Sequence, residues 1–510
     1  MIKAVCIGKH RTAGGVITGY DLECGLTGAL RMGPLELKQA IRENRIQVSN
    51  LKLTIDNRLI STDDIKSKEN RCVINESFVE KAFDKAEGSV QFKTVSSSEL
   101  RNILYKANIL GLYCTEVDAN VFRIDRRDNT LVISDRHFRL VSDCSGLFSN
   151  LVLDKLDLTE VDCKSVTVAK SMFYGSKIQE LILGDFGGER FINAAEMFSN
   201  FKTHILDLTN MQTHNVFTMH GMFFKCVADE IRLGKLITDH VNSTGYMFSY
   251  CEVPRLDLSG SNTENVINME GMFSGCRIAD LDISGLDTSS VFKMSNMFEG
   301  IHTRSIDIRH FKTSKLQYIT EMFKGCTVND IKASGLKLPL VTQATKMFSG
   351  SVVARLDISG FNAPKLTDTE RMFSDCTIRD INISGFNAPR IQDMGEMFKG
   401  SRFDILNLKS FSTKHVRYMH NMFSDAVIAD LNISSFDTSN VEFMMEMFAR
   451  SNIYEIDVSN FNTSKLINVS KLFSNCKAKK INIGTLRIKH LAHWNTIFIG
   501  CGAEITGNIV

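Results

Sequence analysis

The sequence predicts an α/β solenoid, in which a parallel sheet forms one face and short helices form the other, preceded by a small α+β module. Two observations predict this fold class. A Phe stands every 25 residues from Phe148 to Phe498, in 15 copies without insertion or deletion, and Met precedes it in twelve of them. Nearly every copy also contains one short apolar-polar-apolar triplet. A repeat of constant length is typical of solenoids, whose copies stack only on their neighbours.

Residues 1–95 lack this repeat and predict the small α+β module. The segments "VCIGK" and "GVITGYDLE" are typical of strands around a Gly-rich turn, and "VSNLKLTIDNRLI" is typical of a strand followed by an Asp-Asn turn. Two short helices are predicted at "GPLELKQAIREN" and "SFVEKAFDKAEG". Residues 96–130 are expected to cap the first strand of the array, which occupies residues 131–510.

The stretch "GKHRTAGG", residues 8–15, is the part of this module that most resembles a chemical motif. A phosphate-binding loop needs Gly-x-x-x-x-Gly-Lys followed by Ser or Thr, so that backbone amides surround the phosphates. Here Lys9 precedes the Gly pair and His10 follows Lys9, so the spacing is wrong for that loop. A basic hairpin loop that contacts a partner and a solvated turn are the alternatives.

Each repeat begins with a triplet that predicts a strand with one buried face, as in Leu281-Asp282-Ile283. A turn of the type Ser-Gly-Phe follows, as at Ser384-Gly385-Phe386, where Gly suits a tight turn and Phe can pack inside. Successive strands are expected to pair in parallel and in register.

The second half of each repeat predicts a short helix. Val291, Met294, Met297 and Phe298 have the spacing i, i+3, i+6, i+7, which places them on one helical face. Thr288 precedes this segment as a candidate N-cap. Proline is favoured at the first position of a helix, and three of the five prolines occupy the next position, Pro339, Pro364 and Pro389.

The Met-Phe pairs are predicted to fill the space between the helices and the sheet, because Phe never varies and Met adapts to irregular gaps. A soft-metal site or a promiscuous binding surface is the alternative for the Met stripe. Trp494, the single Trp, is predicted to cover the apolar surface of the last repeat.

The pattern "MFxxCxIxxLDISGFDTSxVxxMxxMF" resembles the BspA-family leucine-rich repeat of bacterial surface proteins and mycoplasma lipoproteins. The resemblance covers about 131–510 and implies a leucine-rich-repeat solenoid with a binding role and no catalysis. The chain differs from the surface members of that family, because it shows no signal peptide, lipobox or anchor.

Composition and cysteine use favour a folded protein in a reducing compartment. The net charge of +2 does not indicate a nucleic-acid partner, and no apolar segment is long enough to predict a membrane span. Seven of the 13 cysteines occupy one repeat position, where most other copies place Ser, Ala or Ile. This favours small, buried, unpaired thiols and a cytoplasmic location, with a disulfide ladder as the alternative.

No residue set predicts a reaction centre. The twelve His form no ligand set, no Gly-x-Ser-x-Gly motif occurs, and no Cys lies in a nucleophile motif. The sequence therefore predicts no enzyme, no cofactor and no metal site. Calcium is not indicated either, because the turn-borne Gly-Asp repeats of calcium-binding solenoids are missing.

One exposed column has a chemical pattern and is the candidate binding site. The middle residue of the strand triplet is expected to point away from the core, and neighbouring carboxylates about 5 Å apart repel one another. A binding surface for basic or amide-rich groups is one interpretation, and a structural or inherited hydrogen-bonded ladder is the other. The column comprises Asp157, Asp207, Asp257, Asp282, Asp307, Asp357, Asn382, Asn407, Asn432, Asp457 and Asn482.

We therefore predict a non-catalytic scaffold that binds a protein partner on its exposed sheet face. A structural assembly protein, phage- or envelope-associated and built by self-association of solenoids, is the first alternative. An enzyme with its activity in residues 1–95 is the second.

Overall fold

The computed structural model describes two compact units, Met1–Lys93 with Glu116–Val121, and Thr94–Thr115 with Phe122–Val510. The described backbone comprises residues 2–11, 17–24, 28–32, 46–49, 52–55, 58–61, 93–94, 122–125, 130–133, 138–140, 142–159, 161–234 and 239–510, and side chains are described within these ranges from Leu140 onward.

The described part of the first unit consists of strands. In a four-stranded sheet, β1 (Ile2–Arg11) pairs antiparallel with β2 (Ile17–Cys24) and parallel with β4 (Ile46–Ser49), while β3 (Gly28–Met32) lies at the edge. β5 (Lys52–Ile55) pairs antiparallel with β6 (Arg58–Ser61), and the Asp-Asn turn predicted between them lies outside the described residues. The two helices predicted in this module lie outside the described residues. Residues 8–11 of the "GKHRTAGG" stretch belong to β1, and the rest lies outside the described residues.

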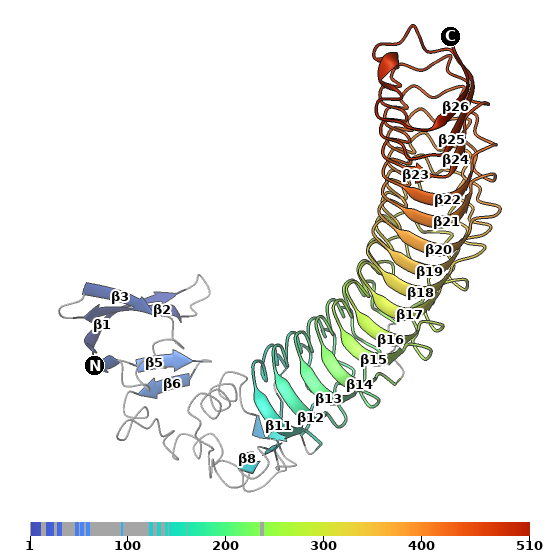
Figure 1. Ribbon diagram of the computed structural model, residues 1–510. Helices are drawn as coiled ribbons and strands as arrows, with labels where there is room; N and C mark the ends of the chain where they lie inside the picture. Colours follow the sequence, from blue (N-terminus) through green and yellow to red (C-terminus); the bar gives the residue numbers. More distant parts are fainter. Residues whose placement is uncertain are drawn as a thin grey trace. The chain divides into compact units, whose positions relative to one another are not determined.

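The second unit is a parallel β-solenoid of about 14 turns, each contributing one strand to the same face (Figure 1). A 15-stranded sheet runs from β8 to β23, and only its first pair, β8 with β9, is antiparallel. A three-stranded sheet of β24, β25 and β26 follows. The strands are β7 (Lys93–Thr94), β8 (Phe122–Asp125), β9 (Thr130–Ile133), β10 (Phe138–Arg139), β11 (Val152–Asp157), β12 (Lys177–Ile182), β13 (Lys202–Asp207), β14 (Val227–Arg232), β15 (Glu252–Asp257), β16 (Arg277–Asp282), β17 (His302–Asp307), β18 (Thr327–Lys332), β19 (Val352–Asp357), β20 (Thr377–Asn382), β21 (Arg402–Asn407), β22 (Val427–Asn432), β23 (Asn452–Ile453), β24 (Glu455–Asp457), β25 (Lys480–Leu486) and β26 (Glu504–Ile509).

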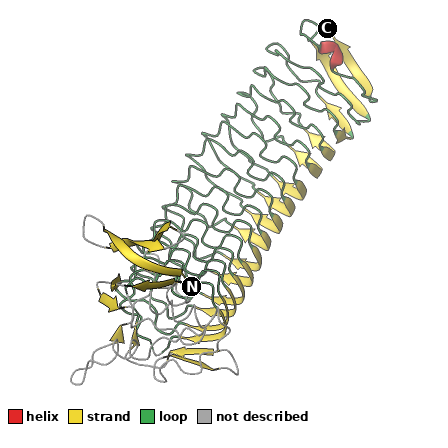
Figure 2. Ribbon diagram, turned by 90° about the vertical axis from the view of Figure 1, so that its left-hand side faces the viewer, coloured by secondary structure: helices red, strands yellow, loops and turns green. Residues whose placement is uncertain are grey.

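The strands form where the predicted apolar triplets lie. In β11, Leu153 and Leu156 are buried, as is Leu158 just after the strand, while Asp154 and Asp157 face outward. One residue of each triplet therefore faces solvent, as alternation along a strand requires. Figure 2 shows the strands stacked along one edge of the solenoid, with turns making up the remainder of each coil.

The predicted short helices are wrong, because the Met-Phe segments are chains of turns. The N–H groups of Met294, Asn296 and Phe298 donate to carbonyls of the next coil, at 2.8–3.1 Å. The intervening Met297 N–H closes a tight turn on the carbonyl of Met294. Asn296 and Gly300 have left-handed backbones, with φ of 59° and 62°. A left-handed residue stops a right-handed helix, so residues at this spacing prevent one from forming in the segment. Bonds between coils thus replace the bonds that an α-helix would make within one coil.

Thr288 is not a helix N-cap, because its hydroxyl joins two coils. Its Oγ1 donates to the carbonyl of Lys312 and accepts the Lys312 N–H at 2.7 Å, and its side chain is buried. The proline interpretation changes in the same way. Pro364 lies inside a β-turn closed by the N–H of Leu366 on the carbonyl of Ala363, and proline favours the second position of such turns.

The Phe ladder forms the centre of the core, as the repeat predicted. Consecutive rings from Phe148 to Phe498 stack at 5.0–5.7 Å between centroids and within 13° of parallel. The adjoining Met side chains, such as Met297, are also fully buried. The core interpretation of the Met-Phe pair is therefore confirmed.

Cys163 and the seven cysteines of the shared repeat position are free, and all of them but the half-buried Cys501 are buried, in agreement with the prediction of unpaired core thiols. Burial raises the pKa of the Cys276 and Cys326 thiols to about 12. At the last coil, Trp494 begins the short 3-10 helix η2 (Trp494–Thr496) and is half-buried. Among the described residues no helix has the length and apolar character to cross a membrane.

Candidate functional site

All eleven members of the Asp/Asn column lie on the outer side of the strands, where each side chain is exposed or half-buried. In each, the side-chain Oδ1 accepts the backbone N–H of the second residue further on, at 2.9–3.2 Å. This contact is an Asx-turn, which ends the strand and begins the following corner. A local structural role therefore accounts for the choice of Asp or Asn at this column. The other carboxylate oxygen, Oδ2, accepts from an arginine in Asp207, Asp257 and Asp307.

Local donors favour the charged form of two carboxylates in this column, those of Asp257 and Asp307. The Ser259 hydroxyl is the main reason that the pKa of Asp257 lies below its ordinary value. The Arg309 guanidinium likewise lowers the pKa of Asp307, to which it donates hydrogen bonds of 2.6 and 2.9 Å. The repulsion between the carboxylates of this column is partly offset by arginines on the same face, such as Arg309.

Replacing Asp357 by alanine is expected to lower the free energy of unfolding by about 1 kcal/mol, because the N–H of Ser359 loses its acceptor. Replacement by asparagine keeps an acceptor at that place, as Asn382 does in the next coil, and is expected to have a much smaller effect. Urea unfolding followed by circular dichroism measures both variants. Equal losses would assign the effect to the charge rather than to the turn.

Strand pairing is uneven along the sheet, and one weak junction lies inside the Asp/Asn column. β15 and β16 share five residue pairs, whereas β16 and β17 share one, Arg277 with His302. The turn after β16 lies close to the preceding coil, since a Cβ on Gly285 would lie 2.4 Å from the carbonyl oxygens of Leu258 and Ser259. The next coil instead reaches back with His310, whose Nε2 lies 3.1 Å from the Ile283 carbonyl oxygen.

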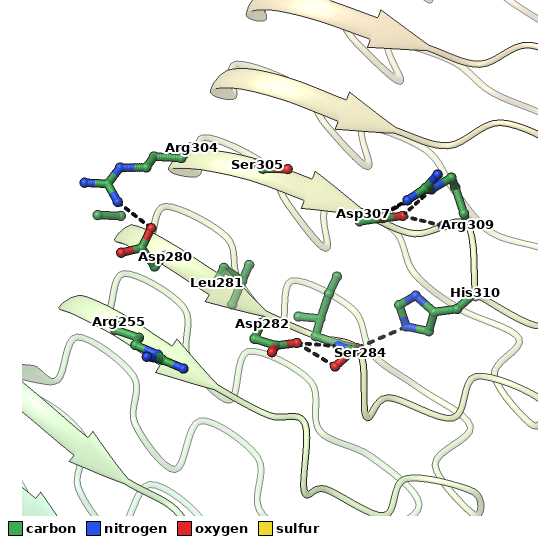
Figure 3. Close-up of a pocket in the computed structure, with 12 residues that line it drawn as sticks. Arg255, Asp280, Leu281, Asp282, Ser284, Arg304, Ser305, Asp307, Arg309 and His310 are labelled. Carbon is green, nitrogen blue, oxygen red and sulfur yellow. Dashed lines mark hydrogen bonds and ion pairs between the residues drawn. The ribbon is translucent and has the colours of Figure 1, made fainter.

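A groove of about 790 Å³ opens on the sheet face at this junction (Figure 3). We call it the β16–β17 groove. Leu281 lies at its floor and is half-buried, whereas the equivalent Leu256 and Ile306 are fully buried. Charged side chains of both signs line it: Arg255, Arg304, Arg309, Asp280, Asp282 and Asp307.

Two of the aspartates in the groove have cationic partners and one does not. Arg304 binds Asp280 at 2.6 Å, and Arg309 binds Asp307 at 2.6 Å. The Oδ1 of Asp282 accepts the N–H and the hydroxyl of Ser284, at 3.0 and 2.6 Å. Within the described part of the chain, no hydrogen bond or ion pair reaches the Oδ2 of Asp282. Asp282 is thus an anion in the groove without a counter-ion.

The sequence interpretation identified the aspartates of the column and missed the arginines and the histidine beside them. Arg309 and His310 stand where neighbouring coils carry Ser and Gly, as at Ser334-Gly335 and Ser359-Gly360. This departure from the repeat was the available signal. In the solenoid residues that the structure describes, no group of three or more His, Cys, Asp or Glu could hold a metal ion.

The repeat region resembles one known family. Four overlapping stretches, 142–260, 246–356, 334–406 and 401–507, match the family described as "Mycoplasma protein of unknown function, DUF285". Together they span most of the chain. No curated protein and no solved structure matches the chain.

Proposed function

Because the chain belongs to the DUF285 family, whose function is unknown, we propose a role that rests on its own geometry: a non-catalytic scaffold that binds a partner protein on the exposed sheet face. The β16–β17 groove is the single observation that carries this proposal. It has the volume of a ligand site, an apolar floor and fixed charges, and it opens on the face that all coils share.

The sheet face suits recognition of a protein surface because its charges have regular positions. The column residues of paired strands lie opposite one another, as Asp257 does to Asp282. Charge complementarity of this kind mainly sets association rate and specificity, so the effect of these residues is expected to weaken with salt. A cytoplasmic location and kinship with BspA-type leucine-rich repeats remain part of the proposal, supported by the buried free thiols and the 25-residue period.

Affinity capture from source-cell lysate tests the proposal with a variant that changes charge but keeps the fold. The variant carries D257N, D282N, D307N and D357N, because asparagine serves the same turn at Asn382 and Asn407. The parent chain is expected to capture a partner that this variant captures weakly or not at all. Any partner that the variant still holds is expected to be released at a lower salt concentration than the parent requires.

A matched control makes the same Asp-to-Asn change at four aspartates that also form Asx-turns but lie outside the strands. They are Asp287, Asp368, Asp393 and Asp437. Capture by this control is expected to equal that of the parent. A sheet-face variant that retains the partner, or a control that loses it equally, contradicts the proposal.

Self-association of solenoids is the second candidate, and one observation favours it. The last coil exposes apolar side chains of Ile499, Ile505 and Val510, by 53%, 40% and 53%. A solution mass that rises with protein concentration, measured by light scattering, would favour assembly, and a constant monomer mass would contradict it.

A further inference from the structure

We propose that the β16–β17 groove holds a basic side chain, Arg or Lys, carried on an extended segment of the partner, with Asp282 as its counter-ion. This inference rests on the scaffold function proposed above. The scaffold proposal places the partner on the sheet face, and this inference adds which type of partner side chain binds at one position on that face.

The opening itself is the first argument. At the β16–β17 junction the strands share a single pair, and the turn after β16 lies against the coil before it. The space that this leaves is bridged by the His310 side chain rather than by a backbone ladder. Figure 3 shows the two strands with Asp282 on one side of the opening and Asp307 on the other.

The second argument is the floor of the groove. The small side chains of Ala279 and Ser305 and the half-buried Leu281 leave room for an inserted side chain. Arg and Lys carry long apolar stems below their charged heads, and such stems pack well over an apolar surface. Leu281 supplies that surface directly beside Asp282 in the chain.

The third argument is charge. Asp280 and Asp307 already bind Arg304 and Arg309, so a second cation at either would displace an existing pair. Asp282 has a free carboxylate oxygen and lies opposite Asp257 on β15 and beside the next column member, Asp307. A cation at Asp282 would therefore relieve repulsion along the column as well as form its own ion pair.

The fourth argument is continuity with a second groove, which favours an extended segment over a single free amino acid. This adjoining groove, of about 560 Å³, shares Ala279 and Arg304 with the first and is lined at its other end by Val227 and Pro254. Lining residues of the two grooves follow β17, whose six residues span about 20 Å, and the second groove also extends across β14, β15, β16 and β18. An extended segment of about six residues covers that length.

An array of acetylated hexapeptide amides tests the inference on the full chain. One position holds arginine or its neutral isostere citrulline, and the other five vary among Ala, Val, Leu, Ser and Thr. Labelled protein is applied at an ionic strength of about 0.15 M. Some arginine peptides are expected to bind, and their citrulline counterparts to bind about tenfold more weakly.

Two variants locate the binding on the array. D282N keeps the turn acceptor and is expected to lose about tenfold in affinity for the arginine peptides, as citrulline does. D357N changes the same column outside the groove and is expected to bind as the parent does. The inference is wrong if no peptide distinguishes arginine from citrulline, if D282N binds undiminished, or if D357N loses equally.

The array and the lysate capture fail independently. If capture depends on the sheet face while D282N leaves the array unchanged, the scaffold function stands and the groove inference falls. If capture ignores the sheet face and no arginine peptide binds, both fall.

Discussion

Replacing Phe298 by alanine is expected to lower the local free energy of unfolding by about 4 kcal/mol, because a fully buried ring is lost from the middle of a continuous stack. The Phe298 ring lies 5.6 Å from that of Phe273 and 5.2 Å from that of Phe323, so the cavity also breaks two stacked contacts. Neighbouring coils cannot collapse into the space without breaking the bond from the Phe298 N–H to the Met322 carbonyl.

Hydrogen exchange is the suitable measurement, because long repeat arrays open locally instead of unfolding as one unit. Faster exchange is expected in the coils on both sides of residue 298 and not in distant coils. Phe217 provides the matched control, since its ring stacks on His240 at 5.3 Å but is 55% exposed. Phe217→Ala is expected to have an effect below about 1 kcal/mol. Similar effects of the two substitutions would contradict the role of the ladder.

Replacing Gly285 by alanine is expected to lower the free energy of unfolding by about 3 kcal/mol, because the new Cβ would meet two backbone carbonyl oxygens at 2.4 Å. Backbone atoms of the coil containing Leu258 and Ser259 cannot rotate away as a side chain can. The turn after β16 must therefore move, and the contact that positions it is lost.

Gly335 occupies the same repeat position as Gly285. Comparing alanine substitutions at the two sites distinguishes the cost of a steric clash from the cost of a left-handed backbone. The φ of Gly335 is +73°, and no atom lies within 4 Å of an added Cβ. Gly335→Ala is therefore expected to cost about 1 kcal/mol, the penalty for a left-handed residue that is not glycine. Chemical unfolding of both variants gives the comparison. A larger loss for Gly335→Ala would show that backbone conformation, not close approach, governs this turn.

Much of the fold could be predicted from the period alone. The constant 25-residue spacing indicates stacked coils, the triplets mark the strands, and the invariant Phe marks the core. The helices were predicted wrongly because Val291, Met294, Met297 and Phe298 have a spacing that turns can also produce. The residue two after each Phe is most often Gly, Asn or Asp, as at Gly300, and these are the residues that tolerate a left-handed backbone.

The candidate site was less predictable, because its geometry depends on differences between coils that look alike. Asp257, Asp282 and Asp307 occupy one column with similar neighbours, yet β15 and β16 share five residue pairs whereas the junction after β16 opens into the groove. Two contacts accompany the opening: Gly285 lies against the preceding coil, and the His310 side chain extends back to the Ile283 carbonyl. A repeat consensus predicts neither contact. The Asx-turns could be anticipated from the recurring Ser two residues after the column, but whether Asp282 lacked a counter-ion required the positions of the arginines.

The uneven strand pairing has a mechanical consequence. A pull along the solenoid axis loads successive junctions in series, so every junction carries the same force and the weakest yields first. The β14–β15 and β16–β17 junctions share one residue pair each and are expected to open first under force. The junction between β15 and β16, with five residue pairs, is expected to stay closed. A ligand seated across β16 and β17 would reinforce that junction and leave the β14–β15 junction as the first to open under force.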